Sequence, residues 1–132
     1  MKIIKSLTLG LLLLFVINSA QSSTTLDIPV RIFDAMKVGN ATELAKYFNS
    51  SIELVILEKE EIYSKQQAEQ VLRNFFSNNK VTSFTLLHQG GRDGAKYAIG
   101  NLKTENKSFR VYFLVKDDSG KPLIHQLRIE EE

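Results

Sequence analysis

The spacing of apolar side chains predicts two helices before the first strand. A first helix is expected between Asp27, which would cap its N-terminus, and Gly39, which would end it, with Pro29 in the first turn. Its apolar positions recur at helical spacing: Ile28, Ile32, Phe33 and Met36. A second, short helix is predicted from residue 41 or 42, and the polar run Asn49-Ser50-Ser51 would end it. One side of that helix would be apolar: Leu44, Ala45 and Phe48.

A strand pair and a third helix are predicted next. Residues 52–57 are rich in branched apolar side chains, and Ile62-Tyr63 begins a short return strand after a polar turn. Ser64, with Gln67 three residues later, has the spacing of a capping box. The helix behind it carries apolar side chains on one stripe: Ala68, Val71, Leu72, Phe75 and Phe76. This is the clearest helical pattern in the chain, and the helix is expected to end near residues 78–79.

After residue 80 the apolar period changes to two, which predicts four strands. They are expected at residues 81–88, 95–103, 108–116 and 122–130, joined as successive hairpins. The order α-α-β-β-α-β-β-β-β separates helices from strands. It predicts one α+β domain over residues 21–132, with three helices packed on a mainly antiparallel sheet.

The register of the last hairpin follows from which residues must share a face. A three-residue loop, Asp118-Ser119-Gly120, pairs Val115 with Leu123 and Phe113 with His125. A shift of one residue would set opposite faces against each other. One face of this hairpin is then strongly apolar, and it is expected to lie under the helices.

The second face of the predicted sheet is apolar and aromatic with an arginine rim. An exposed patch of this kind is typical of an interface. A mixed solvent face is the alternative, because scattered apolar residues are normal on protein surfaces. The predicted interface residues are Tyr97, Ile99, Arg110, Tyr112, Leu114 and Ile124.

The first 20 residues have the pattern of a signal peptide. Lys2 and Lys5 form a basic start, residues 7–17 are almost wholly apolar, and Asn18-Ser19-Ala20 has small side chains. The apolar run is shorter than the roughly 20 residues that span a bilayer. We expect cleavage near Ala20, a periplasmic or secreted mature domain, and no stable membrane span afterwards. An uncleaved N-terminal anchor is the alternative.

Composition narrows the expected partners. The chain has no cysteine, so the exported domain would have no disulfide and no lipoprotein thioether. Of its 17 basic residues, two lie in the predicted signal peptide, which leaves 15 against 15 acidic residues. A neutral mature domain gives no electrostatic reason to expect nucleic acid or anionic lipid as a partner.

The order of elements is similar to that of the nuclear transport factor 2-like superfamily, a cone-shaped α+β fold. Within it, the runs "LLHQGGRDGAKYAIGNL", "FRVYFLVK" and "LIHQLRIE" resemble a family of small exported bacterial proteins known only as a domain of unknown function. The resemblance implies a cavity between the helices and the concave face of a curved sheet. Some superfamily members are enzymes there, others bind ligands, and others dimerise through the sheet.

Two histidines and one glutamate are the candidates for acid–base chemistry. On the predicted register His125 faces the helices, either as a general base in an apolar pocket or as a buried, hydrogen-bonded core residue. His88 would lie at the cavity rim, or would bond the backbone of Gly90-Gly91 at the end of its strand. Glu53 alternates with Val55 and Leu57 and is the one carboxylate expected to face inward.

Other site residues follow from the expected cavity. The residues predicted to line a ligand site are His125, Tyr47, Phe75 and Phe113. Two histidines without cysteine make a poor metal set, so neither a metal nor a cofactor is expected.

Two functional hypotheses remain. The first is an exported, non-enzymatic domain that forms a homodimer through its sheet and binds a small apolar ligand or an envelope protein. The second is a small-molecule lyase or isomerase that uses a cavity histidine, and it fails if Phe75 or Phe113 fills the site.

Overall fold

The computed structural model describes residues 27–132, so the predicted signal peptide and residues 21–26 lie outside the described part. The helices are α1 (Val30–Val38), α2 (Ala41–Ala45) and α3 (Lys65–Asn78). The strands are β1 (Phe48–Ile56), β2 (Lys59–Ser64), β3 (Val81–Arg92), β4 (Ala95–Thr104), β5 (Ser108–Asp118) and β6 (Lys121–Glu131). The predicted order and types of the elements are therefore confirmed.

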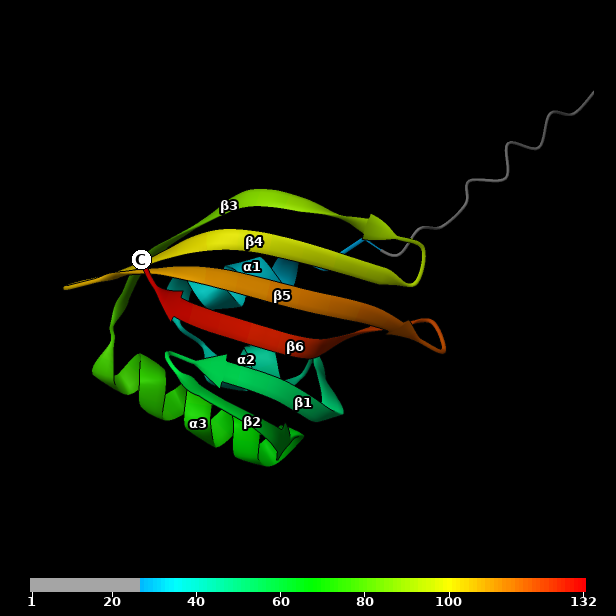
Figure 1. Cartoon of the computed structure of the whole chain (residues 1–132), viewed down its shortest axis with the longest axis horizontal. Helices are drawn as coiled ribbons and strands as arrows, with labels where there is room; N and C mark the ends of the chain where they lie inside the picture. The colour runs from blue at the N-terminus through cyan, green and yellow to red at the C-terminus, as the bar shows by residue number, and fades with distance from the viewer. Residues whose placement is uncertain (1–26) are drawn as a thin grey trace, which may run out of the picture.

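The six strands form one sheet in the order β2-β1-β6-β5-β4-β3. Neighbouring strands are antiparallel, except that β1 and β6 are parallel. Figure 1 shows the helices behind this sheet, with α3 beside the β1–β2 end. We call the helix-covered side the inner face and the opposite side the outer face.

The helix ends are set by local hydrogen bonds. In the capping box of α3, the Gln67 backbone N–H donates to the Ser64 hydroxyl (3.3 Å) and the Ser64 N–H donates to the Gln67 side chain (3.1 Å). Gly39 ends α1 with φ 63°, as predicted. The predicted Asp27 cap is wrong, because Pro29 occupies the N-cap position and no side chain caps α1.

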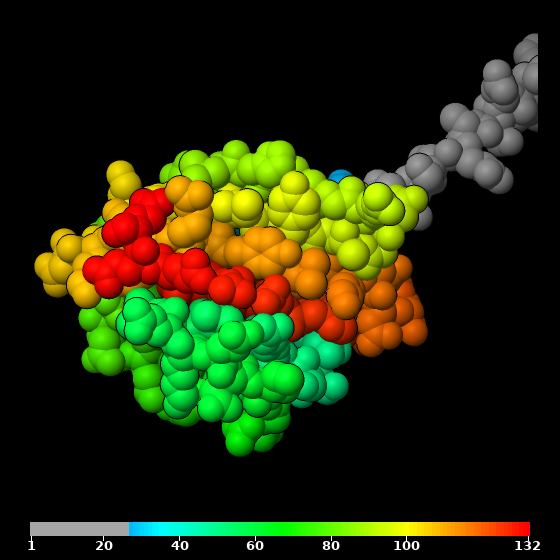
Figure 2. Space-filling view, viewed as in Figure 1, coloured from blue at the N-terminus to red at the C-terminus, as the bar shows by residue number. Residues whose placement is uncertain are grey.

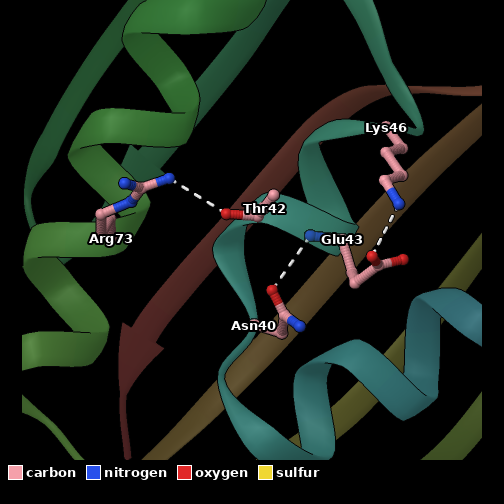
Figure 3. Close-up of polar contacts among 5 residues, drawn as sticks. All are labelled: Asn40, Thr42, Glu43, Lys46 and Arg73. Atoms are coloured by element: carbon pink, nitrogen blue, oxygen red, sulfur yellow. Dashed lines mark hydrogen bonds and ion pairs between the residues drawn. The ribbon is translucent and has the colours of Figure 1, made fainter.

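The short helix α2 is fixed at both ends and tied to α3 (Figure 3). The Asn40 side chain accepts a hydrogen bond from the Glu43 backbone N–H at 3.1 Å, and Lys46 pairs with the Glu43 carboxylate at 2.7 Å. Arg73 of α3 donates to the Thr42 hydroxyl at 3.0 Å. These contacts hold α2 although five residues are too few for a stable isolated helix.

The first strand begins earlier than predicted. Phe48 was expected on α2, but it starts β1 and pairs with Ile124. The Ile124 N–H donates to the Tyr47 carbonyl at 2.6 Å, so the segment after α2 joins the sheet rather than continuing the helix. Phe48 is still buried, because a side chain at this junction reaches the same core from either element.

The register of the last hairpin differs from the prediction. The loop has two residues, Ser119 and Gly120, both with positive φ (51° and 86°), as in a type I′ turn. An extra residue in β6 then shifts the pairing, so that Val115 lies opposite Ile124 and Leu114 lies opposite Gln126. The extra residue is His125.

A second bulge lies in β3. Leu86 pairs with Gly100 and His88 pairs with Ile99, which leaves Leu87 without a partner. The strand continues through Gly90 and Gly91 to Arg92, beyond the predicted end at His88. The hairpin turn is therefore Asp93-Gly94.

Candidate functional site

The space between the helices and the inner face is filled by aromatic side chains. Phe33 of α1 stacks on Phe84 at 6.1 Å between ring centroids, and both rings contact Phe113 edge-on at 6.2 and 6.3 Å. Phe75 of α3 meets Phe109 at 5.2 Å. These five rings are at most 8% exposed. The lyase or isomerase hypothesis requires a cavity in this space. Phe75 and Phe113, the two residues that must not fill such a cavity, are among the rings that occupy it.

The predicted ligand set does not line an open site. Phe113 is fully buried and Phe75 is 6% exposed, so both are core residues. Tyr47 is partly buried against the core, and its carbonyl bonds Ile124, the neighbour of His125. Tyr47 is thus linked to the residue before His125 through the backbone alone, and the two phenylalanines belong to the packed core.

His125 lies at the β6 bulge rather than opposite Phe113, whose partner is Leu127. Its Nε2 atom is buried and has no hydrogen-bond partner among the described residues. Burial lowers the pKa of His125 below its ordinary value, Lys116 lowers it further, and Asp118 opposes them. Within residues 27–132 no carboxylate or hydroxyl group is bonded to this Nε2 atom as a partner for general acid–base catalysis.

The lowered pKa of His125 predicts a loss of stability in mild acid. Near the ordinary pKa of 6.5, His125 binds a proton more readily in the unfolded chain than in the folded one. The free energy of unfolding should therefore fall as the pH drops from about 7 to 5. Urea titrations of the wild type and of His125→Gln test this, because the variant should lose that part of the slope. At pH 8 both side chains are neutral, so the difference measured there gives the packing cost alone. Parallel pH profiles for the two proteins would contradict the assignment.

His88 faces outward, because the Leu87 bulge shifts the alternation by one residue. The prediction of a position at the cavity rim is therefore wrong. Its Nε2 lies 3.0 Å from the Tyr97 hydroxyl, rather than bonding the Gly90-Gly91 backbone. The Tyr97 ring lies over Gly90, where an added Cβ would come within 2.8 Å of the hydroxyl oxygen. The glycine thus makes room for the aromatic ring on the outer face.

Glu53 also lies on the outer face, and not inward as predicted. Its neighbours Ile52 and Leu54 are buried in the core, so alternation along β1 turns Glu53 the other way. A hydrogen bond to Glu53 and repulsion from its charge raise the pKa of Glu60, while Arg128 opposes the shift. Glu53 therefore interacts with a second carboxyl group, and no hydrogen bond joins it to either histidine among the described residues.

The outer face carries a continuous apolar and aromatic patch. Two rows of residues cross the sheet side by side: Val55, Arg128, Tyr112, Ile99 and His88 in one, and Glu53, Gln126, Leu114 and Tyr97 in the other. We call Tyr97, Ile99, Tyr112 and Leu114 the outer patch, and Arg128 and Gln126 of β6 separate Val55 from it. Figure 2 shows the outer face with the atoms of β4, β5 and β6 at its centre and no helix over it.

Five of the six predicted interface residues lie on this face. Tyr97 and Tyr112 are stacked, with ring centroids 6.3 Å apart, and Arg110 lies at the rim. The prediction of Ile124 as an interface residue is wrong, because the bulge at His125 turns its side chain inward, where it is fully buried. Val55 lies on the same face of β1 as Glu53, outside the helix-covered core, but it is only 4% exposed and offers little surface to a partner.

The arginines of the rim are already paired. Arg110 donates to the Glu132 carboxylate from Nε (3.1 Å) and Nη2 (2.9 Å), and Arg128 donates to Glu130 at 2.8 Å. Glu132 also accepts from the Asn101 amide at 2.8 Å. The rim thus combines opposite charges, which limits repulsion when such a surface is covered.

Neither a membrane helix nor a metal site is found within residues 27–132. No helix in this range is long and apolar enough to cross a bilayer. No group of three or more histidine, aspartate or glutamate side chains is placed to hold a metal ion there.

Comparison with solved structures defines the class of fold. An NTF2-like protein of unknown function from Cytophaga hutchinsonii superposes with a TM-score of 0.57 at 11% identity, covering 78% of this chain and 85% of that one. At that identity the likeness shows the fold alone. The protein has the nuclear transport factor 2-like α+β fold.

The family is narrower than the fold. The sequence pattern of DUF4783, a domain of unknown function, matches residues 29–130. A DUF4783 protein from Bacteroides uniformis is 40% identical with a TM-score of 0.77, covering 80% of this chain and 98% of its own. One from Bacteroides fragilis is also 40% identical with a TM-score of 0.77, covering 80% and 100%. The chain belongs to the DUF4783 family. A search of curated proteins finds no match.

Proposed function

We propose that the protein is an exported, non-enzymatic domain that works as a homodimer formed through its outer patch. The observation that carries the proposal is the uncovered outer face, where Tyr97 stacks on Tyr112 between Ile99 and Leu114. Tyrosine and arginine are enriched at interfaces, since they combine apolar area with a polar end. Export rests on the signal-peptide pattern of residues 1–20.

A non-enzymatic role is supported by what fills the interior. The phenylalanine rings occupy the layer in which a substrate would have to bind, and His125, His88 and Glu53 lie apart from one another. The outer patch is an apolar and aromatic surface that no helix covers. A two-fold dimer places the same patch on both partners. The arginine–glutamate pairs beside the patch of one partner would then face the same pairs on the other.

The dimer predicts a specific effect of charge on the outer patch. Leu114 lies on the outer patch opposite Tyr97 and is half-buried. Leu114→Glu should raise the Kd of the dimer by about a hundredfold, because it buries an unpaired carboxylate within the interface. Sedimentation equilibrium of the purified mature domain measures this change.

Val38→Glu is the matched control. Val38 on α1 is 71% exposed and lies away from the outer face, so the same chemical change should leave the Kd unaltered. Circular dichroism checks that both variants are folded. A wild-type protein that remains a monomer at every concentration would refute the dimer.

A further inference from the structure

A groove opens at the end of the core, between α3 and the inner side of the β1–β2 hairpin. It has a volume of about 280 Å³ and is lined by Leu54, Ile56, Lys59, Tyr63, Val71 and Asn74. Ile56, Tyr63 and Val71 are three of the five partly buried apolar residues that pack against the core. The core therefore reaches solvent here, in contrast to its centre, where the phenylalanine rings close it. Figure 1 shows α3 beside this hairpin.

The polar groups of the groove are donors that lack acceptors. Lys59 makes no ion pair within residues 27–132. The side-chain oxygen of Asn74 accepts a hydrogen bond from the Gln70 side-chain amide at 3.3 Å. The side-chain N–H groups of Asn74 have no partner in the described part of the chain. The Tyr63 hydroxyl makes no hydrogen bond there either. Glu61 lies on the same side of β2 but does not line the groove.

We propose that this groove binds a small amphipathic anion, with its apolar body on Leu54, Ile56 and Val71 and its carboxylate at Lys59. An ammonium, an amide N–H and a hydroxyl around an apolar floor match the acceptor oxygens of a carboxylate. The volume lies just below the usual range of ligand pockets, about 300–1,000 Å³, so the groove suits a small ligand such as a medium-chain carboxylic acid. The site lies on the helix side of the sheet, so it goes beyond the proposed dimer and does not depend on it.

The mature domain can be tested with anilinonaphthalenesulfonate, a fluorescent apolar anion. We expect one molecule to bind per chain and octanoate to displace it, whereas octylamine, with the same chain and a positive head, should not. Lys59→Glu should weaken binding of the dye by about tenfold or more, since it replaces a charge-assisted contact with repulsion. Val71→Trp should block binding by filling the groove.

Lys103→Glu is the matched control, because Lys103 on β4 is exposed and also forms no ion pair among the described residues. It should leave the affinity for the dye unchanged. Leu114→Glu should also leave the affinity for the dye unchanged while it weakens self-association. The experiments can therefore contradict the groove proposal and the dimer proposal independently. Absence of dye binding to the wild type, or equal affinity for Lys59→Glu, Val71→Trp and the wild type, would overturn the groove proposal.

Discussion

Phe113→Ala is expected to lower the free energy of unfolding by about 3–5 kcal/mol, the usual cost of truncating a buried phenylalanine. Phe113 is fully buried, and its ring contacts both Phe33 and Phe84 edge-on. Removing it takes away apolar burial and leaves a cavity that these rigid neighbours cannot close. Urea denaturation followed by circular dichroism measures the difference.

The same substitution tests whether the interior is closed in the wild type. A cavity lined by phenylalanine stays dry and can bind a small apolar molecule such as benzene. Benzene should therefore stabilise Phe113→Ala against urea and have no such effect on the wild type. Val30→Ala, at a 65% exposed position of α1, is the control and should cost less than about 0.5 kcal/mol. A loss below about 1 kcal/mol for Phe113→Ala would mean that the ring is not part of a packed core.

The filled interior bears on the choice between the two functional hypotheses. A lyase or isomerase needs a cavity in which a histidine meets its substrate and a second polar group. Here the aromatic cluster occupies that volume. His125 is the extra residue of the β6 bulge, and His88 follows the extra residue Leu87 in β3. The features left for function are on the surface, namely the outer patch, where the Tyr97 hydroxyl bonds His88, and the groove beside α3.

The helices and the order of the strands could be predicted because their signals are local. The capping box at Ser64 and Gln67 and the apolar stripe behind it specify α3 without help from the rest of the chain. The start of α1 was less predictable, since Asp27 and Pro29 both suit the first turn of a helix and only the fold selects one. The start of β1 depends on a bond from Ile124, more than 70 residues away.

The facing of the candidate residues could not be predicted, because one extra residue in a strand reverses it. The bulges at Leu87 and at His125 occur where two apolar residues are adjacent, Leu86-Leu87 and Leu123-Ile124, so either member of each pair suits the core. The alternation therefore allowed two registers at each place. The predicted facing of His88, His125 and Ile124 is wrong because the register shifts at these bulges. On the regular parts of β4 and β5 the predicted facing is confirmed for four residues: Tyr97, Ile99, Tyr112 and Leu114.

Gly100→Ala is expected to destabilise the fold by about 3 kcal/mol, at the upper end of the cost of overpacking. Gly100 lies on the inner face of β4, and a Cβ there would overlap the ring of Phe84 and come within 3.0 Å of the Thr85 carbonyl oxygen. The ring cannot move away freely, since it stacks on Phe33 and is 5% exposed. Thermal unfolding of the two proteins at equal concentration gives the difference.

A double-mutant cycle separates this clash from a general effect on β4. Phe84→Leu alone should destabilise the protein, because it removes aromatic contacts with Phe33 and Phe113. In the double variant the smaller leucine leaves room for the added methyl group, so the combined loss should be smaller than the sum by at least about 1 kcal/mol. Strict additivity would mean that the backbone of β4, rather than the ring, resists the substitution. The predicted coupling would instead show that Gly100 allows Phe84 to approach β4 closely, and that this approach helps to close the interior.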